Sequence, residues 1–267
     1  MIVISPTHPW LVRAIEECTE SFSVASPYVG SYFSKIVSQL DSKVALTLLT
    51  RTTLADFASN ASDLDAVRAV ASRAGSVLSL SSLHAKVYVV GRKRALITSA
   101  NSTFSGMHRN RECGFEVTKR SDVDALSAFI RTGFGSSPMP QRWTVDDLDE
   151  LRLPVERLRS VIPRVATLRG HGVEALLRIK LPRRQYHELI HGFSGWLQLT
   201  LEGISRIPSD DFTMNEVMAA CAPLAARRFP ENRHVREKLR QQMQRLRDLG
   251  LVLFLGNGRY ERLAVPT

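Results

Sequence analysis

The sequence predicts an α/β fold in the first half of the chain, followed by a helical connector and a three-helix unit that ends in a β-hairpin. Up to residue 132, short apolar strands alternate with amphipathic helices, which is typical of a layered α/β domain. After residue 193, three helical segments precede two strands that a Gly-Asn-Gly turn separates. These two patterns indicate a layered α/β first domain and a smaller C-terminal unit.

A composition break supports this division. The Gly-, Ser- and Pro-rich segment at residues 133–140 interrupts the hydrophobic periodicity. We therefore predict a first domain at residues 1–136, a basic connector at residues 137–192 and a C-terminal domain at residues 193–267.

Hydrophobic periodicity defines the elements of the first domain. Apolar residues at helical spacing predict helices at residues 9–20, 31–40, 64–74 and 123–132. Apolar and β-branched runs predict strands at residues 22–25, 43–50, 77–80, 86–90, 95–98 and 114–118.

The charge of the chain indicates its partner. The 267 residues are 44% hydrophobic and 23% charged, which is ordinary for a globular protein. The formal net charge of +10 is not ordinary, and it favours nucleic acid over a membrane surface as the acidic partner.

Cysteine usage and targeting signals indicate the compartment. Cys18, Cys113 and Cys221 are far apart and form no C-x-x-C, which is typical of reduced thiols in a cytoplasmic protein. No signal peptide and no membrane-spanning segment are visible, so we expect a cytoplasmic protein with no membrane partner.

The chemistry is concentrated at residues 83–112. His84 and Lys86 are two apart on an expected strand, so both project to one face. A turn and a returning strand would bring Ser99 and Asn101 back beside them. A basic side chain, an amide and a hydroxyl around one imidazole form a phosphate cradle that contains a nucleophile.

This stretch resembles the H-x-K…G-S-x-N signature of the phospholipase D superfamily, and its nuclease branch more than its lipases. The resemblance implies a layered phospholipase D-like fold, a covalent phosphohistidine intermediate, and no metal or other cofactor. His84 would then be the nucleophile, Lys86 and Asn101 would bind the phosphate, and Ser99 would support them.

Two positions depart from the signature. Gly91 stands where the family has an aspartate, and Thr98 where it has the glycine before the serine. The metal-independent restriction endonucleases of this superfamily instead use a glutamate about a strand further on, and Glu112 stands at that place. We expect its carboxylate to accept the Nδ1 hydrogen of His84 and steady the charged ring.

The reaction needs a nucleophile and a separate general acid, yet the chain has no second H-x-K. We therefore predict a homodimer through the nuclease domain, in which two copies pair their His84 residues in one composite site.

The C-terminal segment predicts a DNA-binding unit. Helices are expected at residues 195–206, 214–228 and 235–249, and the last is followed by a β-hairpin at residues 251–262. The motifs F-T-x-x-x-V, N-R-H-V-R, R-Q-Q-M-Q-x-L-R-D-L-G and F-L-G-N-G-R-Y resemble the C-terminal winged helix of the Dam-replacing restriction endonucleases. On the third helix, the apolar stripe leaves basic and amide side chains outward, and the hairpin has a basic tip. The predicted DNA-binding residues are Arg233, Arg236, Arg240, Gln241, Gln244 and Arg259.

Two features of the connector remain. Between residues 152 and 184, nine Lys and Arg residues stand against two glutamates, which suggests either phosphate contact or a solvated surface. His187 to His191 read H-E-x-x-H, the pattern of zinc peptidases. No third ligand follows, and Glu216 belongs to a T-x-x-E capping box. We interpret these histidines as helix-surface or packing residues, and we expect no metal.

The sequence therefore predicts a site-specific DNA endonuclease of the restriction kind, as part of a restriction-modification system, acting on double-stranded DNA. The alternative is a sequence-specific DNA-binding regulator with an inactive nuclease domain, which only Gly91 supports. A phospholipase fits less well because the usual second motif is absent and the winged helix would have no role.

Overall fold

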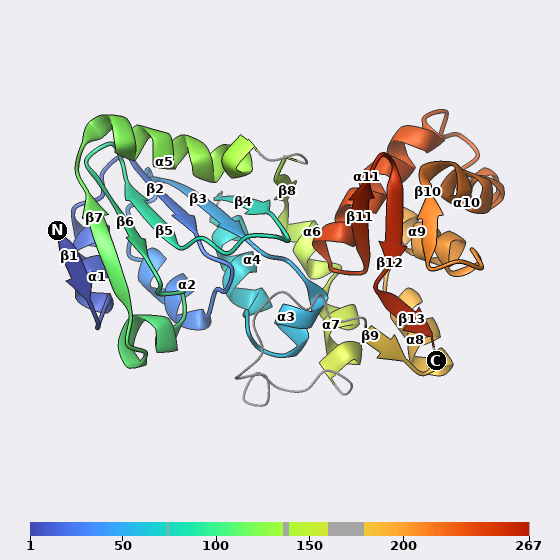
Figure 1. The fold of residues 1–267 in the computed structure, drawn as a ribbon, viewed down its shortest axis with the longest axis horizontal. Helices are drawn as coiled ribbons and strands as arrows, with labels where there is room; N and C mark the ends of the chain where they lie inside the picture. The colour runs from blue at the N-terminus through green and yellow to red at the C-terminus, as the bar shows by residue number, and fades with distance from the viewer. Residues whose placement is uncertain (74, 136–138, 160–178, 267) are drawn as a thin grey trace. The chain divides into compact units, whose positions relative to one another are not determined.

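The computed structural model describes residues 1–73, 75–135, 139–159 and 179–266, and the chain divides into two compact units. The first unit comprises Met1–Thr52 and Asn60–Asp149, and the second comprises Thr53–Ser59 and Glu150–Thr267. Figure 1 shows the elements of both units.

One eight-stranded mixed sheet forms the centre of the first unit, in the order β1-β7-β6-β5-β2-β3-β4-β8. Neighbours β2, β3 and β4 are parallel, and every other pair is antiparallel. In sheet order the strands are β1 (Ile2–Ile4), β7 (Cys113–Val117), β6 (Arg94–Thr98), β5 (Val87–Val90), β2 (Ser21–Ala25), β3 (Ala45–Thr50), β4 (Ser76–Ser79) and β8 (Gln141–Trp143).

Helices cover the two faces of this sheet unequally (Figure 1). On one face lie α1 (His8–Glu16), α2 (Ser31–Val37) and α4 (Leu64–Ser72), and α6 (Val145–Asp149) packs against α4. The other face carries α5 (Arg120–Thr132), followed by the short turn η2 (Gly133–Gly135).

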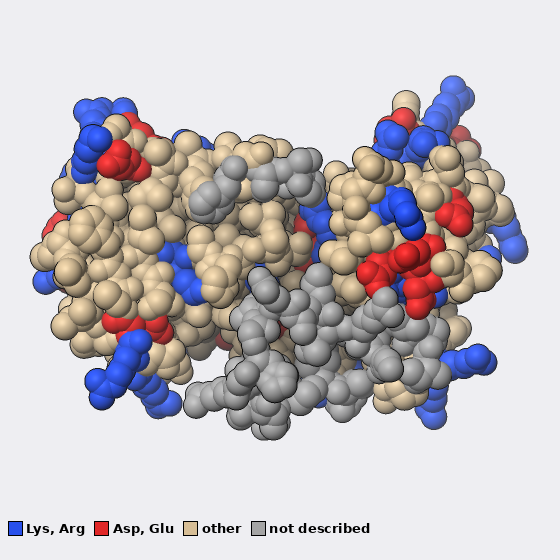
Figure 2. Space-filling model, viewed as in Figure 1, with Lys and Arg blue, Asp and Glu red and all other residues tan. Residues whose placement is uncertain are grey.

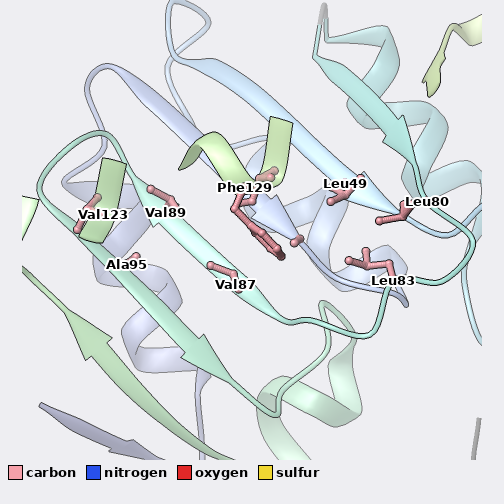
Figure 3. Packing of buried hydrophobic residues seen from close by; sticks show 10 residues of the cluster. Leu49, Leu80, Leu83, Val87, Val89, Ala95, Val123 and Phe129 are labelled. Atoms are coloured by element: carbon pink, nitrogen blue, oxygen red, sulfur yellow. The ribbon is translucent and has the colours of Figure 1, made fainter. Parts of the chain in front are cut away.

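The core beneath α5 follows from strand alternation. Val87 and Val89 of β5 point to the same face, and they pack with Val123, Phe129 and Ile130 of α5 (Figure 3). Burying such side chains contributes about 1.5–3 kcal/mol each. This packing fixes β5, and so fixes the position of the residues just before it.

The second unit contains a three-helix bundle with a β-sheet wing. Its bundle consists of α9 (Gly195–Ser205), α10 (Met214–Arg228) and α11 (Val235–Asp248). The wing is the sheet of β10 (Asp211–Thr213), β12 (Arg259–Arg262) and β11 (Val252–Gly256), in that order. The predicted winged helix-turn-helix is therefore confirmed.

Local signals explain why these elements start and stop here. The Thr213 hydroxyl accepts the Glu216 amide N–H and the Glu216 carboxylate accepts the Thr213 amide N–H, so the predicted capping box opens α10. Asn257 and Gly258 have φ values of 49° and 72°, which the tight turn between β11 and β12 requires.

The remaining elements of the second unit are short. Two helices, α7 (Arg152–Arg159) and α8 (Arg183–Ile190), pack against each other, and β9 (Ile179–Leu181) pairs in parallel with β13 (Ala264–Pro266). The helix α3 (Leu54–Ala58) also belongs to this unit, where it packs against α7, and the Leu54 N–H donates to the Leu249 carbonyl at 3.1 Å.

The division differs from the predicted boundaries in two places. Residues 139–149 pack with the first unit because β8 completes its sheet, and residues 53–59 pack with the second. Of the predicted basic connector, residues 137–138 and 160–178 lie outside the described residues. Among the described helices, none has the length and apolar character needed to span a bilayer.

Candidate active site

The pairing of β5 with β6 brings the predicted site residues together. Val87 pairs with Ile97, and the Thr98 N–H donates to the Lys86 carbonyl at 3.1 Å. Ser99 therefore lies beside the start of β5, as the predicted hairpin requires.

His84 and Lys86 lie side by side just before β5. Lys86 Nζ donates to the His84 carbonyl at 2.8 Å and lies 3.5 Å from His84 Nε2. The imidazole is exposed and the ammonium group is half-buried. An exposed imidazole next to a fixed cation is accessible to an approaching phosphate.

The pKa of Lys86 depends on its burial and on two charged side chains from other parts of the sheet. Burial lowers the pKa of Lys86 below its usual range; the Glu112 carboxylate opposes this shift, and Arg51 at the end of β3 adds to it. The guanidinium of Arg51 lies 5.5 Å from the ring centroid of Tyr28. Arg51 is a cation beside the site that sequence reasoning missed.

Glu112 is held by side chains on both sides. One carboxylate oxygen accepts the Ser99 hydroxyl, and the other accepts Asn110 Nδ2 at 3.0 Å. The Ser5 hydroxyl donates to the Glu112 carbonyl at 3.0 Å and accepts the Glu112 backbone N–H. The structure thus brings Ser99 and Glu112 together, while the expected bond from His84 to Glu112 stays a prediction.

Asn101 presents an unsatisfied polar atom. Its Oδ1 is buried and has no hydrogen-bond partner among the described residues. Such an atom costs about 1–3 kcal/mol, and a bound ligand that donates a hydrogen bond removes this cost. Because a half-turn exchanges the two ends of an amide, Nδ2 can occupy the same position and donate to a phosphate oxygen.

Hydrogen bonds with buried residues of β5 and the end of β2 hold the loop after β6 in place. The Tyr88 hydroxyl donates to the Ala100 carbonyl at 3.0 Å and lies 3.0 Å from the Ser102 hydroxyl. The Ser102 N–H donates to the Ser26 hydroxyl at 2.9 Å, at the end of β2. These bonds hold the loop that carries Asn101, so the Ser-Pro-Tyr segment that begins at Ser26 has a supporting role.

The two departures from the family signature have local explanations. Gly91 has a φ of +50° in the turn between β5 and β6, at the opposite end of β5 from Lys86. The Thr98 hydroxyl donates to the Cys113 carbonyl at 3.1 Å and accepts the Ala100 N–H at 3.2 Å. Neither residue takes part in the contacts that join His84 to Lys86 or Ser99 to Glu112.

The predicted DNA-binding residues are all exposed on the second unit. On α11 the apolar stripe of Leu239, Met243 and Leu246 is buried, and the opposite face is outward. Figure 2 shows Lys and Arg side chains projecting from this unit. The exposed set is Arg233, Arg236, Arg240, Gln241, Gln244 and Arg259.

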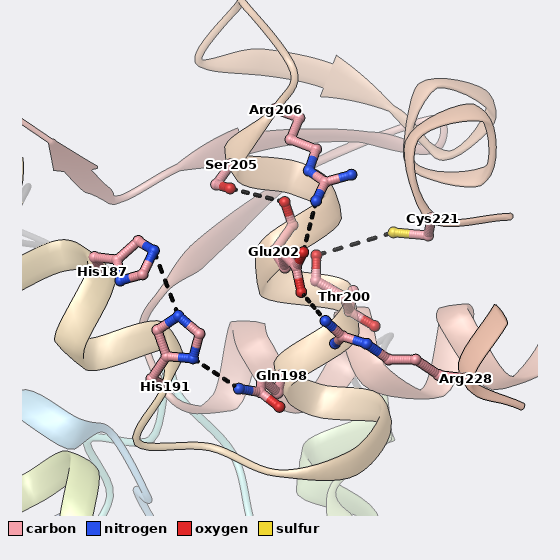
Figure 4. Close-up of polar contacts among 9 residues, drawn as sticks. All are labelled: His187, His191, Gln198, Thr200, Glu202, Ser205, Arg206, Cys221 and Arg228. Carbon is pink, nitrogen blue, oxygen red and sulfur yellow. Dashed lines mark hydrogen bonds and ion pairs between the residues drawn. The ribbon is translucent and has the colours of Figure 1, made fainter. Parts of the chain in front are cut away.

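The H-E-x-x-H segment forms no three-ligand cluster. His187 and His191 are exposed with their Nε2 atoms 3.4 Å apart, and His191 Nδ1 lies 3.2 Å from Gln198 Nε2 (Figure 4). The carboxylate of Glu188 accepts from Arg184 at 3.1 Å. Across the described residues, His, Cys, Asp and Glu side chains form no group of three that could hold a metal ion.

Two family models match the chain. Residues 11–132 match the model described as "Cardiolipin synthase, PLD-like domain", and residues 193–262 match the "Dam-replacing HTH domain". Both resemblances noted from the sequence are thereby confirmed.

Three solved structures are similar to parts of the chain. Nuc from Salmonella typhimurium, a phospholipase D family member, is 12% identical with a TM-score of 0.46, over 54% of this chain and 97% of Nuc. NucT from Helicobacter pylori is 11% identical with a TM-score of 0.43, over 54% of this chain and 98% of NucT. A phosphatidylserine synthase from Haemophilus influenzae is 13% identical with a TM-score of 0.43, over 60% of this chain and 43% of that protein.

Proposed function

We propose that this chain, which combines a phospholipase D-like domain with a Dam-replacing helix-turn-helix domain, is a site-specific DNA endonuclease of the restriction kind. The observation that carries the proposal is the convergence of two contacting pairs at the β5–β6 hairpin, His84 with Lys86 and Ser99 with Glu112, with the Glu112 charge acting on Lys86. The basic helix of the second unit supplies the match to DNA.

The proposed reaction is an in-line displacement at phosphorus. His84 Nε2 attacks the scissile phosphate, a bond forms to phosphorus, and the bond from phosphorus to one ester oxygen breaks. Lys86 and Asn101 hold the non-bridging oxygens, and the Glu112 carboxylate steadies the imidazole charge. Water then attacks phosphorus, the bond from phosphorus to His84 Nε2 breaks, and the group that protonated the leaving oxygen accepts the proton of the water. We propose that no divalent metal is required, because Lys86 and the Lys86 of a second copy of the chain balance the phosphate charge.

The general acid is proposed to be His84 of a second copy. Two other histidines of the same unit, His8 and His108, lie against each other with ring centroids 4.3 Å apart and planes tilted by 34°. Burial and the neighbouring His8 lower the pKa of His108, so this ring holds a proton less readily than an ordinary histidine. A general acid must hold a proton, which favours the second His84 over His108.

An uncovered sheet face supports the dimer. Ile2 pairs with Phe115, and Phe115 pairs with Ile97, so these side chains form a row across β1, β7 and β6. They are 70%, 57% and 44% exposed, because α5 covers only the β5 side of this face. Figure 2 shows an uncharged surface over most of β7. Exposed apolar patches of this kind mark interaction sites.

This row borders the active site. Ser99 follows Ile97 by two residues, and its N–H donates to the carbonyl of Cys113, two residues before Phe115. A two-fold axis through the row would therefore bring two catalytic centres close together. We propose that this face is the dimer interface.

The test of the proposed chemistry is capture of the covalent intermediate. Duplex DNA is mixed with the protein, quenched in denaturant and separated on a denaturing gel. We expect a protein–DNA adduct that is stable to alkali and labile to acid, as a phosphohistidine is. The adduct should be absent with His84→Ala. An adduct of equal yield in the His84→Ala protein would refute the assignment of the nucleophile.

A DNA-binding regulator with an inactive nuclease domain is the alternative. Its sequence support was Gly91, and the positive φ at Gly91 gives that residue a role in the turn instead. The alternative predicts tight binding of duplex DNA with neither an adduct nor a cut.

A further inference from the structure

An aromatic cluster lies beside the candidate active site and has no role in the proposed chemistry. The His108 ring stacks on Phe104 with centroids 4.6 Å apart, and the Tyr32 ring meets His108 edge-on at 5.0 Å. His8 closes the cluster through its hydrogen bond with the Tyr32 hydroxyl, and the Arg109 guanidinium lies 5.0 Å from the Phe104 centroid. His8 comes from α1, Tyr32 from α2, and His108 and Arg109 from η1 (Ser105–Arg109), which Phe104 directly precedes.

The cluster is fixed to the loop that carries Asn101. The Gly30 N–H donates to the Ser102 carbonyl at 2.9 Å, which ties the start of α2, and so Tyr32, to this loop. A Cβ added at Gly106 would lie 2.5 Å from the Asn101 carbonyl oxygen, so glycine lets η1 pack directly on Asn101. The aromatic rings are therefore neighbours of a proposed phosphate ligand.

The cluster is not part of the hydrophobic core. Phe104 is 46% exposed, and His8, Tyr32 and His108 are only half-buried. Phe104 stacks on His108, and the guanidinium of the exposed Arg109 lies over the Phe104 ring, so a planar ligand would stack on this ring by displacing the Arg109 side chain.

The charges nearby restrict the class of ligand. Arg109 and Arg111 are exposed on the segment between the rings and Glu112, and both can contact phosphates. Burial and His8 lower the pKa of His108, which favours the neutral form of the ring next to Phe104. Neutral rings flanked by arginines are the combination that binds an unstacked nucleobase on a phosphate backbone.

We propose that Phe104, with His108, Tyr32 and Arg109, forms a stacking platform for a nucleobase that leaves the DNA stack next to the scissile phosphate. This inference rests on the proposed nuclease function and adds a substrate contact to it. Bases inside a duplex are stacked on each other, so the platform implies that the DNA is distorted at the cut.

The experiment is a binding cycle in the His84→Ala protein, which is expected to bind DNA without cutting it. Duplexes contain the cut site mapped with the unaltered protein, either intact or with a single abasic position beside the cut. We expect Phe104→Leu to weaken binding of the intact duplex about ten-fold. Removing the one base that stacks on the platform should weaken binding by the protein with Phe104 to the same extent. The two changes together should cost no more than either alone. Phe104→Trp should restore binding because it restores a ring.

Two outcomes would overturn the platform. Either Phe104→Leu binds the intact duplex as tightly as Phe104, or the effects of Phe104→Leu and of every abasic position multiply. The Phe104→Leu protein that retains His84 is assayed in parallel for the covalent adduct. If the Phe104→Leu protein forms the adduct and the two effects on binding multiply, the platform is wrong and the nuclease proposal stands. If the unaltered protein forms no adduct, the nuclease proposal itself fails.

Discussion

Glu112 shows how much one side chain does in the candidate site. It accepts hydrogen bonds from Ser99 and Asn110, and its charge acts on Lys86, whose pKa burial lowers. Phosphate binding needs protonated Lys86, so activity should be lost as pH rises through its pKa. Because that pKa lies below the ordinary 10.5, kcat/KM should fall at a lower pH than an unperturbed lysine would allow.

Glu112→Gln tests this coupling. Removing the carboxylate removes the charge that raises the pKa of Lys86, so the fall in kcat/KM should move to lower pH, and the rate should drop about 100-fold or more. Ser99→Ala is the matched control, since it breaks a hydrogen bond to Glu112 but keeps the charge. A pH profile that does not move in the glutamine variant would contradict the assigned coupling.

Sequence reasoning predicted part of this candidate site and missed another part for a physical reason. His84, Lys86, Ser99 and Asn101 could be predicted because a hairpin of period two has a local signature. Ser5 was not found, because its hydrogen bonds to Glu112 span 107 residues and leave no local pattern. Only the pairing of β1 with β7 brings those residues together.

At the scale of elements, α11 is proposed to read the DNA sequence. Gln241 and Arg240 are exposed on its outward face, and such side chains can bond base edges in two places. Gln241→Ala should cost about 1–3 kcal/mol and relax preference at one base pair, measured by selection from a duplex library.

Arg206→Ala is the control for that measurement. Arg206 lies at the end of α9, where it donates to Glu202 at 2.6 Å, and it should not alter base preference (Figure 4). Unchanged base preference in Gln241→Ala and in Arg240→Ala would exclude this face of α11 from sequence recognition.

Packing of α9 on α10 gives a stability prediction. A Cβ at Gly203 would overlap Cys221 Sγ, and it would lie 3.4 Å from the Cys221 Cα. Gly203→Ala should therefore lower the free energy of unfolding by about 1–3 kcal/mol, although alanine favours helix by about 1 kcal/mol. Cys221→Ala should relieve most of this loss in the double variant, as measured by urea unfolding. Additive effects of the two substitutions would contradict the proposed overlap.

Elements were predictable where they are long and periodic. The strands β5 and β6 and the helices α5, α10 and α11 have repeating apolar residues, and each was found. The three-residue strands β1, β8 and β10 have no such repeat, because long-range pairing alone defines them. The segment at residues 53–59 was missed for the same reason, since its partner residues are more than 90 positions away.

At the scale of the whole molecule, the proposed activity requires two copies. Phe115→Lys places a charge in the centre of the exposed row on β1, β7 and β6. We expect a folded monomer by sedimentation that binds DNA through its winged helix but does not cut it. Leu153→Lys, at an exposed leucine of the second unit, is the control and should remain dimeric. A dimer that survives Phe115→Lys would place the interface elsewhere.

The most direct measurement for the whole proposal is cleavage of plasmid DNA in excess chelator, with the unaltered protein and with His84→Ala. If His84 supplies the nucleophile and Lys86 the positive charge, the unaltered protein should cut in chelator at defined positions. His84→Ala should not cut, yet it should shift the same DNA in a binding assay. Cleavage that disappears in chelator and returns with magnesium, or cleavage by His84→Ala, would contradict the proposed mechanism.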